Sequence, residues 1–179
     1  MINIVLYQPE IPQNTGNIMR TCAGTDTMLH LIKPLGFRLD EKSVKRAGVN
    51  YLPFCKYKVY ENYEDFLSQN EGDFYYFTRY SKKNYSTCDY SKKDSNIYLI
   101  FGRESTGIPK DILHKNLDKC VRIPMNDKIR ALNLSNSAAI ALFEALRQQD
   151  FNDLLVKEPF KSEDYISVSY THLTLPTIR

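Results

Sequence analysis

The sequence predicts an α/β fold: a mostly parallel sheet with helices on both faces, in one domain over residues 1–160. Two observations predict it. Short apolar runs alternate along the chain with segments of helical periodicity, which is typical of a parallel sheet covered on both sides. The 179 residues, 42% hydrophobic and 25% charged, suit one globular domain with a substantial core.

Six short runs of aliphatic and aromatic side chains predict the strands of this sheet. They are Ile2–Tyr7, Leu29–Lys33, Tyr57–Tyr60, Asp73–Thr78, Ile97–Phe101 and Lys119–Ile123. The last run stops at Pro124, which has no backbone N–H to donate to a neighbouring strand.

Helices are expected between these runs. The predicted helices are Asn14–Thr25, Asp40–Gly48, Glu61–Gln69, Gly107–Asn116 and Ser135–Gln149. Asn14 or Thr15 can cap the first helix and Asp40 the second, because their side-chain oxygens can accept from free backbone amides. The last helix carries alanines and leucines at helical spacing, so one of its faces is expected to pack against the sheet.

Composition excludes several classes of protein. The apolar runs are too short for a membrane span, and residues 1–20 lack the basic start and apolar core of a secretory signal. The four cysteines form no C-x-x-C pair and the three histidines are scattered, so no metal site is expected. We therefore expect a cytoplasmic protein with reduced thiols.

The end of the chain differs in character from the rest. Residues Ser167–Arg179 contain no acidic side chain, alternate threonine with apolar residues and break at Pro176. This segment resembles read-through sequence, and we expect it to be a non-native tail outside the domain.

The loop before the longest predicted helix is dense in hydrogen-bonding side chains. Around Ala131 and Leu132 it holds Asn126, Asp127, Arg130, Asn133, Ser135 and Asn136. A helix cap needs only one serine or asparagine, and ligands of open α/β sheets bind at the carboxyl ends of strands. The segment is therefore interpreted as part of a functional site.

Two further segments share this character, Pro9–Cys22 and Leu99–Pro109. In this order and spacing the three segments resemble the motifs of the SPOUT methyltransferases. Within that family they are similar to the single-domain TrmL (YibK-like) type, the tRNA (cytidine/uridine-34-2'-O)-methyltransferases. The resemblance covers about residues 1–160. It implies a C-terminal deep trefoil knot, S-adenosyl-L-methionine as cofactor, the tRNA anticodon stem-loop as partner, and a homodimer.

The resemblance also implies the residues of the site. The adenosine of the cofactor is expected in an apolar slot formed by Phe77, Gly102, Ile123, Ala131 and Leu132. The residues expected at the reacting ribose are Asn14, Arg20, Arg130, Asn133 and Ser135. Relatives often have serine where this chain has Ala131, which puts cofactor affinity in question more than activity.

Arg20 is expected to work across the dimer interface, near the cofactor pocket of the other subunit. A guanidinium has a pKa above about 12 and is a poor free base. We therefore expect Arg20 to clamp an RNA phosphate and stabilise charge, with a phosphate or water accepting the ribose proton.

The segment Leu99–Pro109 has the glycine spacing of a phosphate loop but lacks the residues that bind phosphate and magnesium. Ile108 and Pro109 follow Gly107, where a phosphate loop has lysine and serine or threonine, so a nucleotide triphosphatase is not expected. Gly102 can let a flat ligand approach the backbone, or it can be a simple turn glycine. Under the first reading, Gly102→Val weakens cofactor binding without unfolding the domain. Glu104 is expected to be a structural hydrogen-bonding residue.

The net charge of +3 leaves RNA binding to local basic groups. Lys82-Lys83 and Lys92-Lys93 bracket a loop with three tyrosines, Tyr80, Tyr85 and Tyr90. Such a segment suits single-stranded RNA, or it can be an ordinary solvated loop. Two other functions stay open: 2'-O-methylation of ribosomal RNA, and a non-catalytic RNA-binding or ribosome-assembly role.

Overall fold

The computed structural model describes residues 1–39, 52–151, 154–161 and 165–166. The helix predicted at residues 40–48 and the tail at residues 167–179 lie outside the described residues.

Six parallel strands form one sheet in the order β3-β2-β1-β5-β4-β6. The strands are β1 (Ile2–Tyr7), β2 (Met28–Ile32), β3 (Tyr57–Tyr60), β4 (Asp73–Phe77), β5 (Ile97–Phe101) and β6 (Cys120–Val121). The predicted parallel sheet is confirmed. β6 is shorter than the predicted run because Arg122 leaves the sheet, exchanging backbone hydrogen bonds with Lys83 and Tyr85 instead.

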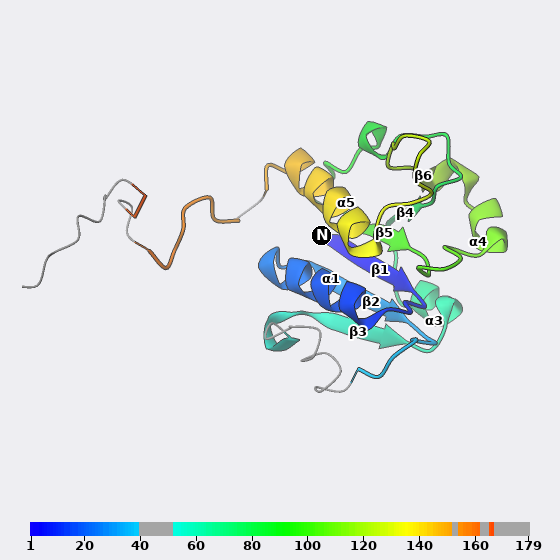
Figure 1. Cartoon of the computed structure of the whole chain (residues 1–179), viewed down its shortest axis with the longest axis horizontal. Coiled ribbons are helices and arrows are strands. Elements are labelled where there is room, and N and C mark those ends of the chain that lie inside the picture. Colours follow the sequence, from blue (N-terminus) through cyan, green and yellow to red (C-terminus); the bar gives the residue numbers. More distant parts are fainter. Residues whose placement is uncertain (40–51, 152–153, 162–164, 167–179) are drawn as a thin grey trace, which may run out of the picture.

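Helices cover both faces of the sheet, as predicted (Figure 1). One face carries α1 (Pro12–Gly24) and α5 (Leu134–Gln148), and the other carries α3 (Tyr63–Ser68) and α4 (Lys110–His114). Three single 3-10 turns complete the elements: η1 (Leu52–Phe54), η2 (Tyr85–Thr87) and η3 (Leu117–Lys119).

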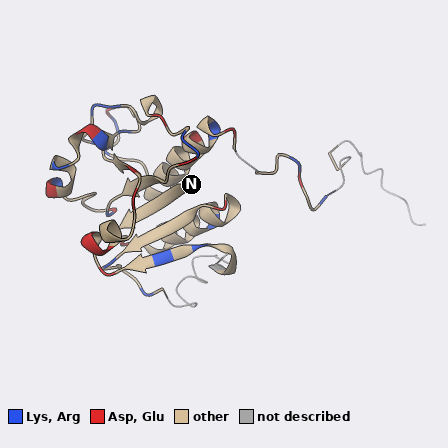
Figure 2. Cartoon of the chain, turned by 180° about the vertical axis from the view of Figure 1, so that it is seen from behind, with Lys and Arg blue, Asp and Glu red and all other residues tan. Residues whose placement is uncertain are grey.

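The central strand β1 shows how the sequence produces two cores. Ile4 and Leu6 pack with α1 and α5, whereas Val5 between them packs with α3 and α4. All three are fully buried, because successive side chains of a strand point to opposite faces and both faces are covered. Charged side chains accordingly gather on the helices and loops around a nearly uncharged sheet (Figure 2).

The start of α1 corrects the predicted cap. The helix begins at Pro12, two to three residues before the expected caps, and its N-cap is Ile11 without a side-chain hydrogen bond. Proline is favoured there because its fixed φ suits a first helical turn. Asn14 and Thr15 therefore lie inside the first turn, which leaves the Asn14 side chain available for contacts elsewhere.

None of the helices in the described part of the chain is long and apolar enough to cross a bilayer. All four cysteines are free and buried.

Candidate active site

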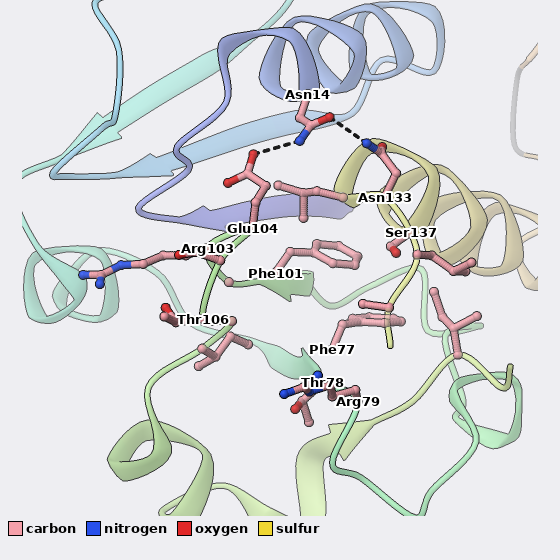
Figure 3. A pocket seen from close by; sticks show the side chains of 18 of the residues that line it. Asn14, Phe77, Thr78, Arg79, Phe101, Arg103, Glu104, Thr106, Asn133 and Ser137 are labelled. Atoms are coloured by element: carbon pink, nitrogen blue, oxygen red, sulfur yellow. Dashed lines mark hydrogen bonds between the residues drawn. The ribbon is translucent and has the colours of Figure 1, made fainter. Parts of the chain in front are cut away.

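A cavity of about 410 Å³ opens at the carboxyl ends of β4, β5 and β6 (Figure 3). It is bounded by the segments that follow these strands, by the loop before α5, and by Asn14 at the start of α1. Ligands of open α/β sheets bind at this edge, and the volume is in the range of small-molecule cofactor sites.

Two stacked phenylalanines form the apolar wall of the cavity. The rings of Phe77 and Phe101 lie with centroids 4.6 Å apart and planes inclined by 21°, and both side chains are buried. Ile108, Ile123 and Leu132 add aliphatic surface around them. The cavity therefore offers a flat, apolar slot with polar groups at its margin.

Glu104 joins the segment Leu99–Pro109 to the segment Pro9–Cys22. Its carboxylate accepts hydrogen bonds from the backbone amides of Glu10 (2.8 Å) and Ile11 (3.2 Å) and from Asn14 Nδ2 (3.0 Å). The carboxylate thus binds the two backbone amides that immediately precede α1 and one side chain of its first turn, and these bonds fix the start of α1 against the loop after β5. The prediction that Glu104 is a structural hydrogen-bonding residue is confirmed.

Asn14 extends this connection to the loop before α5, which contains Asn133. Its Oδ1 accepts from Asn133 Nδ2 at 3.0 Å, so Glu104, Asn14 and Asn133 form one chain of hydrogen bonds along the cavity (Figure 3). Asn133 Oδ1 in turn accepts from the amides of Ser135 and Asn136 as the N-cap of α5. The starts of α1 and α5 are thereby fixed relative to each other.

A second clamp holds the same two loops together. Ser105 donates to the Glu10 carboxylate from its amide (3.0 Å) and from its hydroxyl (2.8 Å), while the Glu10 amide donates to Glu104. The hydrogen bonds from Ser105 hold the pKa of the Glu10 carboxyl below its usual value.

Gly102 is required by its own loop. A Cβ at this position would lie 2.1 Å from the Gly107 carbonyl carbon and 2.1 Å from the Ile108 nitrogen. The loop closes tightly because Arg103 and Gly107 exchange two backbone hydrogen bonds. The expectation that Gly102→Val leaves the domain intact is therefore wrong, since any side chain here strikes backbone.

We predict that Gly102→Ala lowers the stability and the cofactor affinity together, because the displaced loop is also a wall of the cavity. Thermal unfolding and calorimetry with S-adenosylhomocysteine measure the two effects. The matched control is Gly24→Ala, where an added Cβ meets no atom within 4 Å and the helical backbone accepts alanine. A Gly102→Ala protein with the melting temperature of the parent would contradict this account.

The cavity gathers seven of the ten residues expected at the site. They are Asn14, Phe77, Gly102, Ile123, Ala131, Leu132 and Asn133. Arg20, Arg130 and Ser135 are not among the lining residues of this one subunit. Arg20 is exposed on α1, and Ser135 Oγ donates to Asn133 Oδ1 at 2.7 Å.

Sequence reasoning missed part of the lining. Phe101, Thr78, Arg79, Tyr80 and Arg122 also line the cavity. Phe101 was assigned to a strand and not to the site, although its place as the last strand residue before Gly102 is a usable signal. Thr78 and Arg79 likewise follow the last residue of β4.

The architecture and the cavity at the strand ends define a class of RNA-modifying enzyme: the chain belongs to the SpoU rRNA Methylase family, whose model matches residues 1–143. This confirms the resemblance to methyltransferases. Within the class, the tRNA (cytidine(34)-2'-O)-methyltransferase of Methylovorus glucosotrophus is 46% identical over 153 residues, covering 84% of this chain and 97% of its own length. A protein of Geobacillus stearothermophilus is 54% identical over 154 residues, covering 86% of this chain and 98% of its own.

A solved structure described as giving insight into the 2'-OH methylation of C/U34 on tRNA has the same fold, with a TM-score of 0.77 and 36% identity. The match covers 84% of this chain and 97% of that one. An AdoMet-bound rRNA methyltransferase from Sinorhizobium meliloti matches with a TM-score of 0.71 and 26% identity, over 82% of this chain and 56% of that one.

Proposed function

We propose that the protein transfers a methyl group from S-adenosyl-L-methionine to the ribose 2'-hydroxyl of the wobble nucleotide, cytidine or uridine at position 34, in tRNA anticodon loops. One observation carries the proposal: the Glu104–Asn14–Asn133 chain of hydrogen bonds unites the three motif segments around a single cavity. The name and near full-length similarity of the Methylovorus relative support the substrate.

The cavity fits the cofactor in size and surface. A slot walled by Phe77 and Phe101 suits a flat adenine ring, and the exposed backbone around Leu132 and Asn133 offers polar partners to its edge. When bound, the cofactor supplies a methyl group already activated by its sulfonium. The predicted slot residues Phe77, Gly102, Ile123, Ala131 and Leu132 would hold it.

The protein's task is then to position the ribose. The bond from the 2'-oxygen to the methyl carbon forms as the bond from that carbon to sulfur breaks, so the three atoms must lie in line. Asn14 and Asn133 are held by hydrogen bonds at the margin of the cavity, where they can orient the ribose. Arg20 and Arg130 would bind phosphate and stabilise the developing charge, and a phosphate or water takes the proton.

A homodimer completes this proposal. Arg20 does not line the cavity of its own subunit, and in this proposal a second subunit brings it there. Ile140 and Phe143 on α5 are 38% and 48% exposed, one turn apart on the same side of the helix. This apolar surface, together with α1 beside it, is the face we assign to the dimer.

The trefoil knot also belongs to the proposal. The connection between β4 and β5 is bonded to Arg122 through Lys83 and to the end of α5 through Tyr90, whose backbone pairs with Gln148 and Gln149. The segment from Arg122 to α5 would thread beneath this connection.

Ribose methylation mapped in tRNA from a deletion strain tests the function. We expect 2'-O-methylation of the wobble nucleotide to disappear from specific tRNAs and to return with the intact gene. Unchanged wobble methylation would contradict the assignment, and a lost ribosomal RNA methylation would instead support the ribosomal alternative. Methylation by the purified protein would exclude a purely non-catalytic RNA-binding role.

A further inference from the structure

Tyr80 is an exposed aromatic residue at the mouth of the cavity. It belongs to the loop that follows β4, lines the cavity and is 63% exposed, whereas Phe77 and Phe101 inside are 9% and 3% exposed. A ring this exposed adds little to the core, so folding does not explain why it stands there.

The ring of Tyr80 is held in place from one side. Arg79 Nη2 donates to the Tyr80 hydroxyl at 2.6 Å, and its guanidinium carbon lies 4.7 Å from the ring centroid. The loop itself is fixed because Arg122 Nη1 donates to the Arg79 carbonyl at 2.8 Å and the Tyr80 amide donates to Thr78 Oγ1. Figure 3 shows Thr78 and Arg79 across the cavity from Asn14 and Asn133.

The charges of three cations from three segments act on the hydroxyl of this ring. The pKa of the Tyr80 hydroxyl is held below its usual value by the hydrogen bond from Arg79 and by the charges of Arg79, Lys110 and Arg130. Lys110 begins α4, and Arg130 lies in the loop before α5. Within the described part of the chain, none of the three is paired with a carboxylate.

An exposed ring beside cations that pair with no carboxylate in the described residues matches single-stranded RNA. Unstacked bases of RNA loops stack on aromatic and guanidinium planes, and cations nearby bind the flanking phosphates. The cofactor requires the buried slot, so a second flat ligand at the mouth must be a different one.

We propose that Tyr80, held by Arg79, stacks against a base of the anticodon loop adjacent to the methylated nucleotide, and that Lys110 and Arg130 bind the phosphates beside it. This role rests on the proposed function and adds the means by which the RNA is held at the cavity. Tyr80 is thus a substrate-binding residue that acts on RNA affinity and not on cofactor affinity.

A fluorescence experiment tests the stacking directly. The chain contains no tryptophan, so Tyr80→Trp introduces a single fluorophore at the proposed contact. We expect saturable quenching by an anticodon stem-loop RNA and no quenching by S-adenosylhomocysteine. In a series of stem-loops with one abasic position each, one loop position next to the target should abolish the quenching.

A matched control uses Phe54→Trp. Phe54 is 71% exposed on η1, before the opposite edge strand β3, and its tryptophan should not respond to RNA. Among unlabelled variants, Tyr80→Ala should raise the RNA dissociation constant by roughly 5- to 100-fold. Tyr80→Phe should stay close to the parent because the ring remains, and all variants should bind S-adenosylhomocysteine equally.

The outcomes distinguish the stacking role of Tyr80 from the proposed methylation of tRNA on which it rests. An unquenched Tyr80→Trp protein that still methylates tRNA would overturn the stacking role alone. Quenching by S-adenosylhomocysteine would also overturn it, because Tyr80 would then be a wall of the cofactor site. A parent protein that fails to methylate tRNA would overturn the proposed function, and the stacking role with it.

Discussion

Replacing Arg20 with alanine is expected to lower the rate of methyl transfer by roughly 100- to 1,000-fold at saturating tRNA and cofactor, because the charge that we propose to stabilise the attacking ribose oxygen is lost. Cofactor affinity should change little, since Arg20 is assigned to an RNA phosphate and not to the slot that holds the cofactor. Single-turnover methylation and calorimetry with S-adenosylhomocysteine measure the two quantities.

Two comparisons sharpen this result. Arg20→Lys keeps the charge but loses the two-pronged donor geometry, so its rate should lie between parent and alanine. Arg147→Ala removes another exposed helical arginine, which pairs with Glu144 on α5, and should retain activity. Equal losses in Arg20→Ala and Arg147→Ala would show that general charge and not position matters.

Mixing subunits tests whether Arg20 acts across the dimer. Ala131→Trp would fill the slot of its own subunit, because Ala131 lines the cavity from an exposed position. A heterodimer of Arg20→Ala and Ala131→Trp chains then contains one doubly defective site and one intact site. Random mixing should restore about a quarter of the parent's activity in a two-fold symmetric dimer. No recovery despite demonstrated subunit exchange would place the whole site within one chain.

Replacing Glu104 with glutamine is expected to destabilise the fold by about 1–3 kcal/mol and to lower the methylation rate as well. The carboxamide has one acceptor oxygen where the carboxylate has two, and its NH₂ group would face donors. At least one of the amides of Glu10 and Ile11, or the side chain of Asn14, would lose its partner.

Urea unfolding and the rate at saturating cofactor measure these two effects. Glu71→Gln is the matched control because Glu71 is exposed in the turn before β4, away from the cavity. If Glu104→Gln lost stability but kept the parent's rate in the folded protein, Asn14 would not need its carboxylate partner for activity.

The sequence predicted the sheet well because its strands carry a strong signal. β5 is an uninterrupted apolar run and β1 is interrupted only by Asn3; both are buried on both faces, and their predicted bounds agree with the structure. The short β6 was predicted too long, since the bonds that draw Arg122 to Lys83 join residues far apart in sequence.

The site, too, was predictable only in part. The segments that carry chemistry were found, because polar side chains concentrate after strand ends. The partners of those side chains were not predictable. The sequence predicts Asn14 or Thr15 as the cap of α1, but the helix begins at Pro12 and the Asn14 side chain bonds to Glu104 and Asn133 instead. Position 102 requires glycine because the backbone of Gly107 occupies the space of a Cβ, and no pattern of residue types reveals such a contact.

The bond between Asn14 and Asn133 joins residues 119 positions apart. A growing chain therefore has most of its sheet long before it has this cavity, because the last wall is made by the segment that leads into α5. A chain without this segment would contain the residues of β1 through β6 but not the last wall of the slot. We therefore expect S-adenosylmethionine to bind only to a chain in which the segment before α5 has packed against the start of α1 and the loop after β5.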